Sequence, residues 1–252
     1  MIFNDLHDNL SLFSKLQQQV KDIPYDIVFF NGDCIADPPT EEAALRSIVY
    51  YCRGIGSDSI PSVFILGNHE VRGVYGRQLL LYRLLGKAGG DYPYGAFNIG
   101  DTRFVILDFG EDWSDDHPEY IGPPFNKQRK DMAEFMKKEM NSEAFKSAAR
   151  RVLIHHIPVY GYPLGQYYAS YDEWYAEWQS ILANATFDIC INGHMHSYKY
   201  YAKGALGNNF PIVWGGGDNE QNATVIVLRK QGTTMTLTVL NAQGETLLSM
   251  NF

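Results

Sequence analysis

The fold of this chain is decided by the stretch Leu66-Gly67-Asn68-His69-Glu70. It follows Ser62 to Ile65, a short apolar run that predicts a buried strand. An amide and an imidazole therefore stand in the loop directly after a strand. Open α/β sheets carry their binding and catalytic residues in such loops, at the carboxyl ends of the strands. We expect a functional site at this position.

Four other apolar runs end in polar side chains of the same kind. They cover residues 1–4, 27–30, 151–154 and 188–191, and they are followed by Asp5 and His7, by Asp33, by His155 and His156, and by His194 and His196. Six of the seven histidines follow such runs, and only His117 does not. Each pattern is common by itself, so the prediction of a shared site depends on their number, order and position.

Strand and helix patterns alternate along the first part of the chain. This rhythm predicts a parallel sheet with right-handed crossovers, hence an α/β fold. Expected helices cover 10–20, a segment that begins after Thr40, 76–85, 127–140, 142–149 and 172–182. Expected strands 94–99 and 103–108 form a hairpin, and 109–125 is expected to be a surface loop. After Asn192 we expect antiparallel strands at 212–214, 224–229, 233–240 and 246–250.

Length and composition predict one domain over residues 1–252, with mainly antiparallel β-structure from about residue 205. The formal net charge of −8 argues against a nucleic-acid polymer as partner, because such a partner requires a basic face. Three cysteines do not suffice for a disulfide framework. No apolar run has the length of a membrane span. The sequence gives no oligomeric state.

The start of the chain bears on its compartment. Residues Met1 to Asn4 reach the first motif at once, so we expect a first strand that lacks most of its residues. No targeting signal precedes it. The sequence therefore leaves an exported protein and an intracellular protein both open.

The candidate ligands indicate the kind of ion. Carboxylate, amide oxygen and imidazole suit Mn, Fe or Zn, and the lack of thiolates disfavours a structural zinc site. Seven candidate ligands exceed what one ion usually takes from a protein. Two ions that share one carboxylate match this number.

The five blocks together resemble the signature of the calcineurin-like metallophosphoesterase superfamily. They are Asp5-Leu6-His7, Gly32-Asp33, Gly67-Asn68-His69-Glu70, His156-Ile157-Pro158 and Gly193-His194-Met195-His196, in the order of that family. The resemblance covers nearly four fifths of the chain. It implies a four-layer α/β/β/α sandwich in which two mixed sheets face each other.

The resemblance also implies roles for these residues. One ion is bound by Asp5, His7 and His196, the other by Asn68, His156 and His194, and Asp33 bridges them. His156 is assigned rather than His155 because the family ligand stands two residues before a proline. A hydroxide between the ions attacks phosphorus, and His69 protonates the leaving oxygen. Asp33 and His69 are thus the expected catalytic residues.

Two departures narrow the class. The last block of this chain resembles that of the purple acid phosphatases. Those enzymes carry an iron-ligating tyrosine in the second block, where this chain has Asp33-Cys34-Ile35-Ala36-Asp37. We therefore expect no purple colour. Protein serine/threonine phosphatases have an arginine where this chain has Leu66, which argues against phosphoprotein substrates.

Substrate contacts are expected from Asn68, Arg72, His155 and Tyr160. Arg72 and Arg77 either bind phosphate or are solvated charges on a helix. His155 either lies near the substrate or only packs. Tyrosines between 160 and 171 could form an aromatic wall, whereas Trp174 and Trp178 fit the buried face of a helix. Gly215 to Asp218 is expected to be a turn near the site.

We expect an enzyme that hydrolyses a small phosphomonoester or phosphodiester, with a nucleotide as the first substrate to test. The alternative is a non-catalytic protein-binding scaffold of the same fold. All ligand positions and His69 are filled, which favours the enzyme. A nuclease is disfavoured by the acidic stretch from Glu111 to Glu119.

Overall fold

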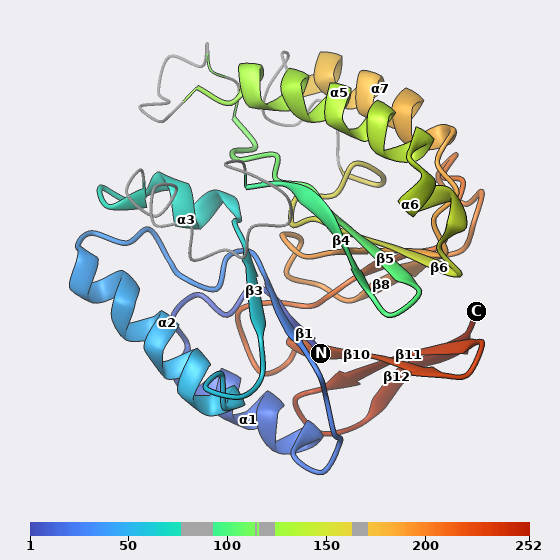
Figure 1. The fold of residues 1–252 in the computed structure, drawn as a ribbon. Helices are drawn as coiled ribbons and strands as arrows, with labels where there is room; N and C mark the ends of the chain where they lie inside the picture. The colour runs from blue at the N-terminus through green and yellow to red at the C-terminus, as the bar shows by residue number, and fades with distance from the viewer. Residues whose placement is uncertain (77–92, 114, 116–123, 163–170) are drawn as a thin grey trace.

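The protein is represented by a computed structural model that describes residues 1–76, 93–113, 115, 124–162 and 171–252. The described strands form two sheets, and the helices lie outside them (Figure 1). The helix expected at 76–85 lies almost wholly outside the described residues, as do Arg77, His117, Tyr167 and Tyr168.

The first sheet combines strands from both ends of the chain. Strands β1, β2 and β3 are parallel, as expected, and β10 pairs antiparallel with β1, with Ile226 opposite Ile2. β11 and β12 extend the sheet in antiparallel order. The order is β12-β11-β10-β1-β2-β3, with β1 at Ile2–Phe3, β2 at Val28–Asn31, β3 at Ser62–Ile65, β10 at Thr224–Gln231, β11 at Thr234–Asn241 and β12 at Thr246–Asn251.

The second sheet begins with the expected hairpin, in which Ile99 lies opposite Thr102. Strands β5, β6, β7 and β9 are parallel. The order is β4-β5-β6-β7-β9-β8, with β4 at Gly95–Ile99, β5 at Thr102–Ile106, β6 at Arg150–Ile154, β7 at Ile189–Asn192, β8 at Lys199–Tyr201 and β9 at Ile212–Trp214.

The expectation of antiparallel strands after Asn192 is wrong for β9, because β9 pairs parallel with β7. The edge strand β8 was not predicted, and it pairs antiparallel with β9. β9 is a run of three buried residues without alternation, so its sequence does not reveal its direction.

The helices cover the two outer faces of the sheets (Figure 1). Phe13 of α1 and Tyr51 of α2 pack against the first sheet, and Met132 of α5 and Trp178 of α7 pack in the core of the second. Side chains from both sheets form a third core between them. The four-layer α/β/β/α prediction is confirmed, with α1 at Leu10–Val20, α2 at Glu41–Ile55, α3 at Asn68–Arg72, α5 at Asn126–Asn141, α6 at Glu143–Ser147 and α7 at Tyr171–Ala183.

The described part of the acidic segment after β5, residues 109–113, 115 and 124–125, differs from the expected surface loop. Phe109 and Phe125 are 2% and 1% exposed, and Glu111 is fully buried. Arg129 of α5 donates to the carbonyl oxygens of Phe109 and Trp113 at 3.1 and 3.4 Å, and also to that of Glu111. Its acidic composition misled the prediction, because the arginines that bind this segment stand elsewhere in the sequence.

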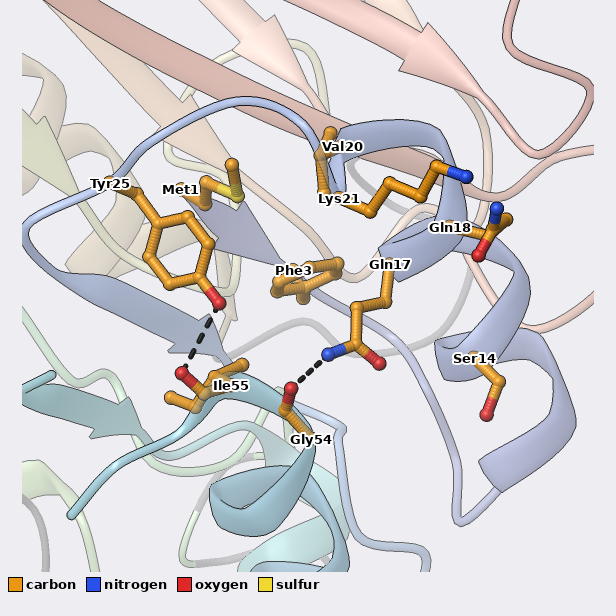
Figure 2. A pocket seen from close by; sticks show the side chains of 10 residues that line it. All are labelled: Met1, Phe3, Ser14, Gln17, Gln18, Val20, Lys21, Tyr25, Gly54 and Ile55. Atoms are coloured by element: carbon orange, nitrogen blue, oxygen red, sulfur yellow. Dashed lines mark hydrogen bonds between the residues drawn. The ribbon is translucent and has the colours of Figure 1, made fainter. Parts of the chain in front are cut away.

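A cavity of about 390 Å³ lies at the amino ends of the strands of the first sheet (Figure 2). There the hydroxyl of Tyr25 donates to the carbonyl oxygen of Ile55 at 3.2 Å, and the Gln17 amide donates to that of Gly54. The described residues that line this cavity include no carboxylate and no imidazole, so it is not the expected metal site. Among the described helices, none is long and apolar enough to span a membrane.

Candidate metal centre

The candidate ligands lie where the two sheets present the carboxyl ends of their parallel strands. The first sheet contributes four of them from the loops after β1, β2 and β3, and the second contributes three from the loops after β6 and β7. They are Asp5, His7, Asp33 and Asn68, and His156, His194 and His196. The site therefore spans both sheets.

One group of ligand atoms belongs to Asp5, His7, Asp33 and His196, and these atoms lie within 4.8 Å of one another. The Nε2 atoms of His7 and His196 are 3.0 Å apart, and His196 Nε2 lies 3.4 Å from Asp5 Oδ1. His7 Nε2 lies 3.9 Å from Asp33 Oδ2. This is the set that the resemblance assigned to the first ion.

The second group belongs to Asp33, His156 and His194, with Asn68 beside them. His156 Nε2 lies 3.0 Å from Asp33 Oδ2, and Asn68 Oδ1 lies 2.9 Å from His194 Nδ1. Asp33 belongs to both groups, as a bridging carboxylate would. His155 belongs to neither group.

These separations fit a bound cation. Ligands at about 2.1 Å from one ion, at right angles, are roughly 3.0 Å apart, close to the shortest separations here. The buried Nε2 of His156 makes no hydrogen bond of good geometry among the described atoms, although Asp33 Oδ2 lies only 3.0 Å away. For Asn68, hydrogen bonding alone favours the swapped amide, whose nitrogen would donate to Asp33 and His194. A cation between Asn68, Asp33 and His194 favours the unswapped amide instead, because its oxygen then binds the cation together with the other two side chains.

The electrostatics of the buried ligands favour a positive charge at this place. Burial by itself lowers the pKa of His156, but Asp33 and Asp5 outweigh burial and raise it to about 10. Burial also opposes ionisation of Asp33, yet His156 holds the pKa of Asp33 well below its usual range. Burial, with the charge of His156, lowers the pKa of His194 to about 4. A divalent cation would therefore displace the proton of His156, and Asp5 also raises the pKa of the ligand His196.

The backbone at the ligands is unusual. Five of the seven ligand residues have a positive φ, which is uncommon for residues other than glycine. They are Asp5, His7, Asp33, His194 and His196. Backbone amides also point at ligand carboxylates: His194 N donates to Asp5 Oδ1 at 2.9 Å, and His69 N, whose own φ is ordinary, donates to Asp33 Oδ1 at 2.9 Å. Such conformations cost about 1–3 kcal/mol each and occur at functional sites.

Glu70 fixes two of the ligand loops, a role that we did not assign from the sequence. Its buried carboxylate accepts hydrogen bonds from the backbone amides of Asp33, Ile35 and Gly67 at 2.8, 2.9 and 2.7 Å. The loops after β2 and β3 are thereby connected through one side chain.

His69 lies beside the ligand groups and not within them. Its ring centroid is 4.7 Å from that of His7, and its side chain is 25% exposed. Its Nδ1 lies 3.1 Å from Asp37 Oδ1. Asp37 follows Asp33 by four residues, and sequence reasoning missed it.

Two expected substrate contacts are not supported by the geometry. His155 is 1% exposed, with Nδ1 2.8 Å from the carbonyl oxygen of Ile157 and Nε2 3.3 Å from Cys190 Sγ. Tyr160 is 3% exposed, and its hydroxyl donates to the carbonyl oxygen of Gln179 at 3.2 Å. Both side chains pack in the interior, because the loop after β6 turns inward.

Arg72 is close to the ligands, but acidic partners occupy its guanidinium. It donates two hydrogen bonds to Glu111, at 2.7 and 2.6 Å, and one to Asp112 at 2.5 Å. Its charge is thus balanced within the protein, which argues against the expected phosphate contact.

The aromatic side chains after β6 include both kinds that we expected, buried tryptophans on a helix face and a loop tyrosine near the site. Trp174 and Trp178 are 9% and 1% exposed, so the buried helix face is confirmed. Tyr162 was only one of several loop tyrosines, yet its ring stacks on that of His194, with centroids 5.4 Å apart and planes at 25°. A stacked tyrosine of this kind carries no sequence signal of its own.

The glycines at 215–217 lie near the site, as expected. A Cβ on Gly217 would lie 2.8 Å from the Cα of His196 and 2.9 Å from the Cβ of Asp5. Asp218 follows, with Oδ2 3.5 Å from His196 Nδ1. The segment therefore supports the first ligand group.

Two mixed sheets face each other, and histidine and carboxylate ligands stand at the carboxyl ends of their parallel strands. This combination of fold and site is that of a metal-dependent phosphoesterase. The chain matches the model of the calcineurin-like phosphoesterases over residues 1–198, and it belongs to that family. No curated protein matches its sequence.

Solved structures share its fold at low identity. A dimetal phosphatase from Danio rerio superposes with a TM-score of 0.68 and 14% identity, over 99% of this chain and 96% of that one. A purple acid phosphatase from yellow lupin (Lupinus luteus) has a TM-score of 0.68 and 16% identity, over 99% of this chain and 52% of that one. At such identities the likeness shows the fold alone.

Proposed function

We propose that the protein hydrolyses small phosphomonoesters or phosphodiesters at a dinuclear centre of Mn, Fe or Zn. The observation that carries the proposal is the pair of ligand groups that share Asp33, with the non-ligating imidazole of His69 beside them. The resemblance to the family assigned the same residues to two ions and a proton donor.

Two bound divalent ions would supply an acidified water and would neutralise the phosphoryl oxygens. Asp5 and Asp33 contribute two negative charges against the four positive charges of such ions, so the centre stays cationic. This explains how a protein with a net charge of −8 would attract a phosphate ester.

His69 would donate a proton or a hydrogen bond to the leaving oxygen, which is the work of a general acid. Asp37 supports this role because its carboxylate faces Nδ1 at 3.1 Å, which orients the ring and leaves Nε2 for the substrate. The side chain is exposed enough to meet a substrate.

The surroundings favour a small substrate over a nucleic-acid polymer. Arg72 lies next to the second ligand group, and Glu111 and Asp112 balance its charge. In the described part of the chain, no arginine without an acidic partner is shown beside that ligand group. Tyr162 is the described loop tyrosine that lies at the ligands, where its ring stacks on that of His194, and a nucleotide stays the first substrate to test.

The test is turnover of para-nitrophenyl phosphate and bis-para-nitrophenyl phosphate by chelator-treated protein supplied with Mn, Fe, Zn or Co. Metal-dependent hydrolysis is expected, with the ratio of the two rates giving the ester preference. His69→Asn should lose roughly 10²–10⁴-fold in turnover while it retains its metal. Glu220→Gln, on the exposed surface, is the control and should match the wild type.

A protein-binding scaffold is the alternative function. It would bind metal and hydrolyse neither ester, and His69→Asn would change nothing that the assay measures. That result would refute the proposed enzyme.

A further inference from the structure

The segment from Phe109 to Trp113 brings a carboxylate to the metal centre that the family signature does not include. Arg129 of α5 fixes its backbone through three carbonyl oxygens. Arg72 of α3 fixes it from the opposite side through Glu111. The segment thus connects a helix of the second sheet with the loop after β3 of the first sheet.

Asp112 lies in this segment with its side chain 13% exposed. Its Oδ1 accepts a hydrogen bond from Arg72 at 2.5 Å, while Oδ2 lies 3.6 Å from His194 Nε2. The hydroxyl of Tyr162 donates to the same Oδ2 at 3.4 Å. Arg72 and Tyr162 therefore orient the carboxylate, and the oxygen that Tyr162 contacts also faces the ligand imidazole.

His194 presents its two nitrogens in opposite directions. Nδ1 faces Asn68 Oδ1 at 2.9 Å, within the second ligand group, and Nε2 faces Asp112. An imidazole that binds a cation through Nδ1 needs its proton on Nε2. A carboxylate at Nε2 fixes that tautomer and the ring plane, and it increases the basicity of the ligating nitrogen.

We propose that Asp112 is a positioning residue for the ion bound by Asn68, His156 and His194, and that it acts through His194 while Arg72 holds its carboxylate. The proposal rests on the proposed metal centre, but not on the proposed reaction. At 3.6 Å Asp112 Oδ2 lies just beyond hydrogen-bond distance of His194 Nε2, so the contact in the geometry shown is electrostatic, between the carboxylate charge and the imidazole N–H.

The chain offers a matched control on the other ion. Asp218 stands behind His196 as Asp112 stands behind His194, with 3.5 Å between its Oδ2 and His196 Nδ1. Asp112→Asn and Asp218→Asn remove the same charge beside a ligand imidazole, although the side chain of Asp218 is 41% exposed and that of Asp112 13%. The proposal predicts that they weaken different ions.

The experiment is calorimetric titration of chelator-treated protein with Mn²⁺, together with electron paramagnetic resonance at two equivalents of Mn²⁺. For Asp112→Asn we expect one of two sites to weaken by roughly 10- to 100-fold. The spin-coupled signal of a manganese pair should give way to that of isolated Mn²⁺, and the metal-free variant should keep the wild-type melting temperature.

Double variants identify the ion that is affected. If Asp112 acts on the ion bound by Asn68, then Asp112→Asn should cost nothing further in an Asn68→Ala background. In a His7→Ala background, which lacks a ligand of the other ion, it should cost its full effect. Asp218→Asn should show the reverse pattern.

Three results would overturn the proposal: unchanged Mn²⁺ affinity in Asp112→Asn, equal weakening of both ions, or a loss confined to the stability of the metal-free protein. Because the readout is Mn²⁺ binding, it is independent of ester hydrolysis. Selective weakening in a protein without turnover would refute the proposed function alone, and turnover with unchanged Mn²⁺ binding would refute this inference alone.

Discussion

Replacement of Glu70 by glutamine should destabilise the metal-free protein by several kcal/mol, although it changes only one atom of a side chain that touches no substrate. The carboxylate of Glu70 is 4% exposed and accepts three backbone hydrogen bonds. The amides of Asp33 and Gly67 share Oε2, and that of Ile35 uses Oε1.

The magnitude follows from these three bonds. A glutamine can place its single oxygen at Oε2, but its NH₂ group then faces the N–H of Ile35. One buried donor without an acceptor costs about 1–3 kcal/mol, and two bonds that lose their charge assistance cost roughly 1 kcal/mol each. The expected loss in the free energy of unfolding is therefore about 3–5 kcal/mol.

The assay is urea unfolding of chelator-treated protein, followed by circular dichroism at a pH above 8, because burial and the charge of Asp33 raise the pKa of Glu70 to about 8 and the argument requires the ionised carboxylate. The matched control is Glu220→Gln, because Glu220 pairs with Lys15 on the surface and both side chains are about half exposed. Such a pair contributes at most about 1 kcal/mol. Mn²⁺ affinity should also decrease in the Glu70 variant, because Asp33 and Asn68 lie on the loops that Glu70 connects.

A loss below about 1 kcal/mol for Glu70→Gln would refute the reasoning, since a single charge-assisted bond is expected to contribute more than that. It would mean that water or a shifted backbone satisfies the three amides as well as the carboxylate does. A large loss for Glu220→Gln would show that the assay does not separate buried from exposed carboxylates.

Three further predictions concern the site. Asp37→Asn should lower turnover by roughly 10- to 100-fold with unchanged Mn²⁺ binding, because it disorients His69, and equal turnover in steady-state assays would contradict this. Gly193→Ala should abolish high-affinity Mn²⁺ binding in calorimetry, because its Cβ would lie 2.6 Å from Asp5 Oδ2; wild-type affinity would exclude that clash. At pH 7, below the His156 pKa of about 10, Mn²⁺ binding should release a proton, so affinity falls as pH decreases. Calorimetry in two buffers of different ionisation enthalpy measures this proton, and a buffer-independent enthalpy would refute its release.

The sequence predicted most of the site because all seven candidate ligands stand shortly after the ends of five strands. A strand end is a local feature, and the topology of parallel sheets then brings such ends together. The placement of Asp5 beside His196 was given by the family resemblance, because the two residues follow strands of different sheets. Local strand and turn patterns predicted the parallel strands β1, β2 and β3 and the hairpin of β4 and β5.

The parts that the sequence did not predict depend on contacts between distant segments. Arg72 looked like a phosphate contact because Glu111 and Asp112, its partners, stand about 40 residues away in an acidic stretch. His155 and His156 are both histidines, so residue type does not distinguish them. The direction of the backbone makes His155 a buried packing residue and His156 a candidate ligand. The parallel direction of β9 depends on the long segment that connects it to β7, and this segment has no periodic pattern that would predict the direction.

The glycines of the signature connect these two kinds of information. A Cβ on Gly67 would lie 2.2 Å from Asp33 Oδ1, and one on Gly193 would lie 2.6 Å from Asp5 Oδ2. Each glycine thus stands where a carboxylate from a different strand approaches the backbone, and no larger residue leaves room for that carboxylate. The glycine of a Gly-Asn-His or Gly-His-Met-His block therefore indicates, within a short stretch of sequence, a contact with a strand that is distant in the sequence. This is why short blocks indicated which side chains lie together, while Asp112, which approaches His194 by its side chain alone, has no signal in the sequence beside that histidine.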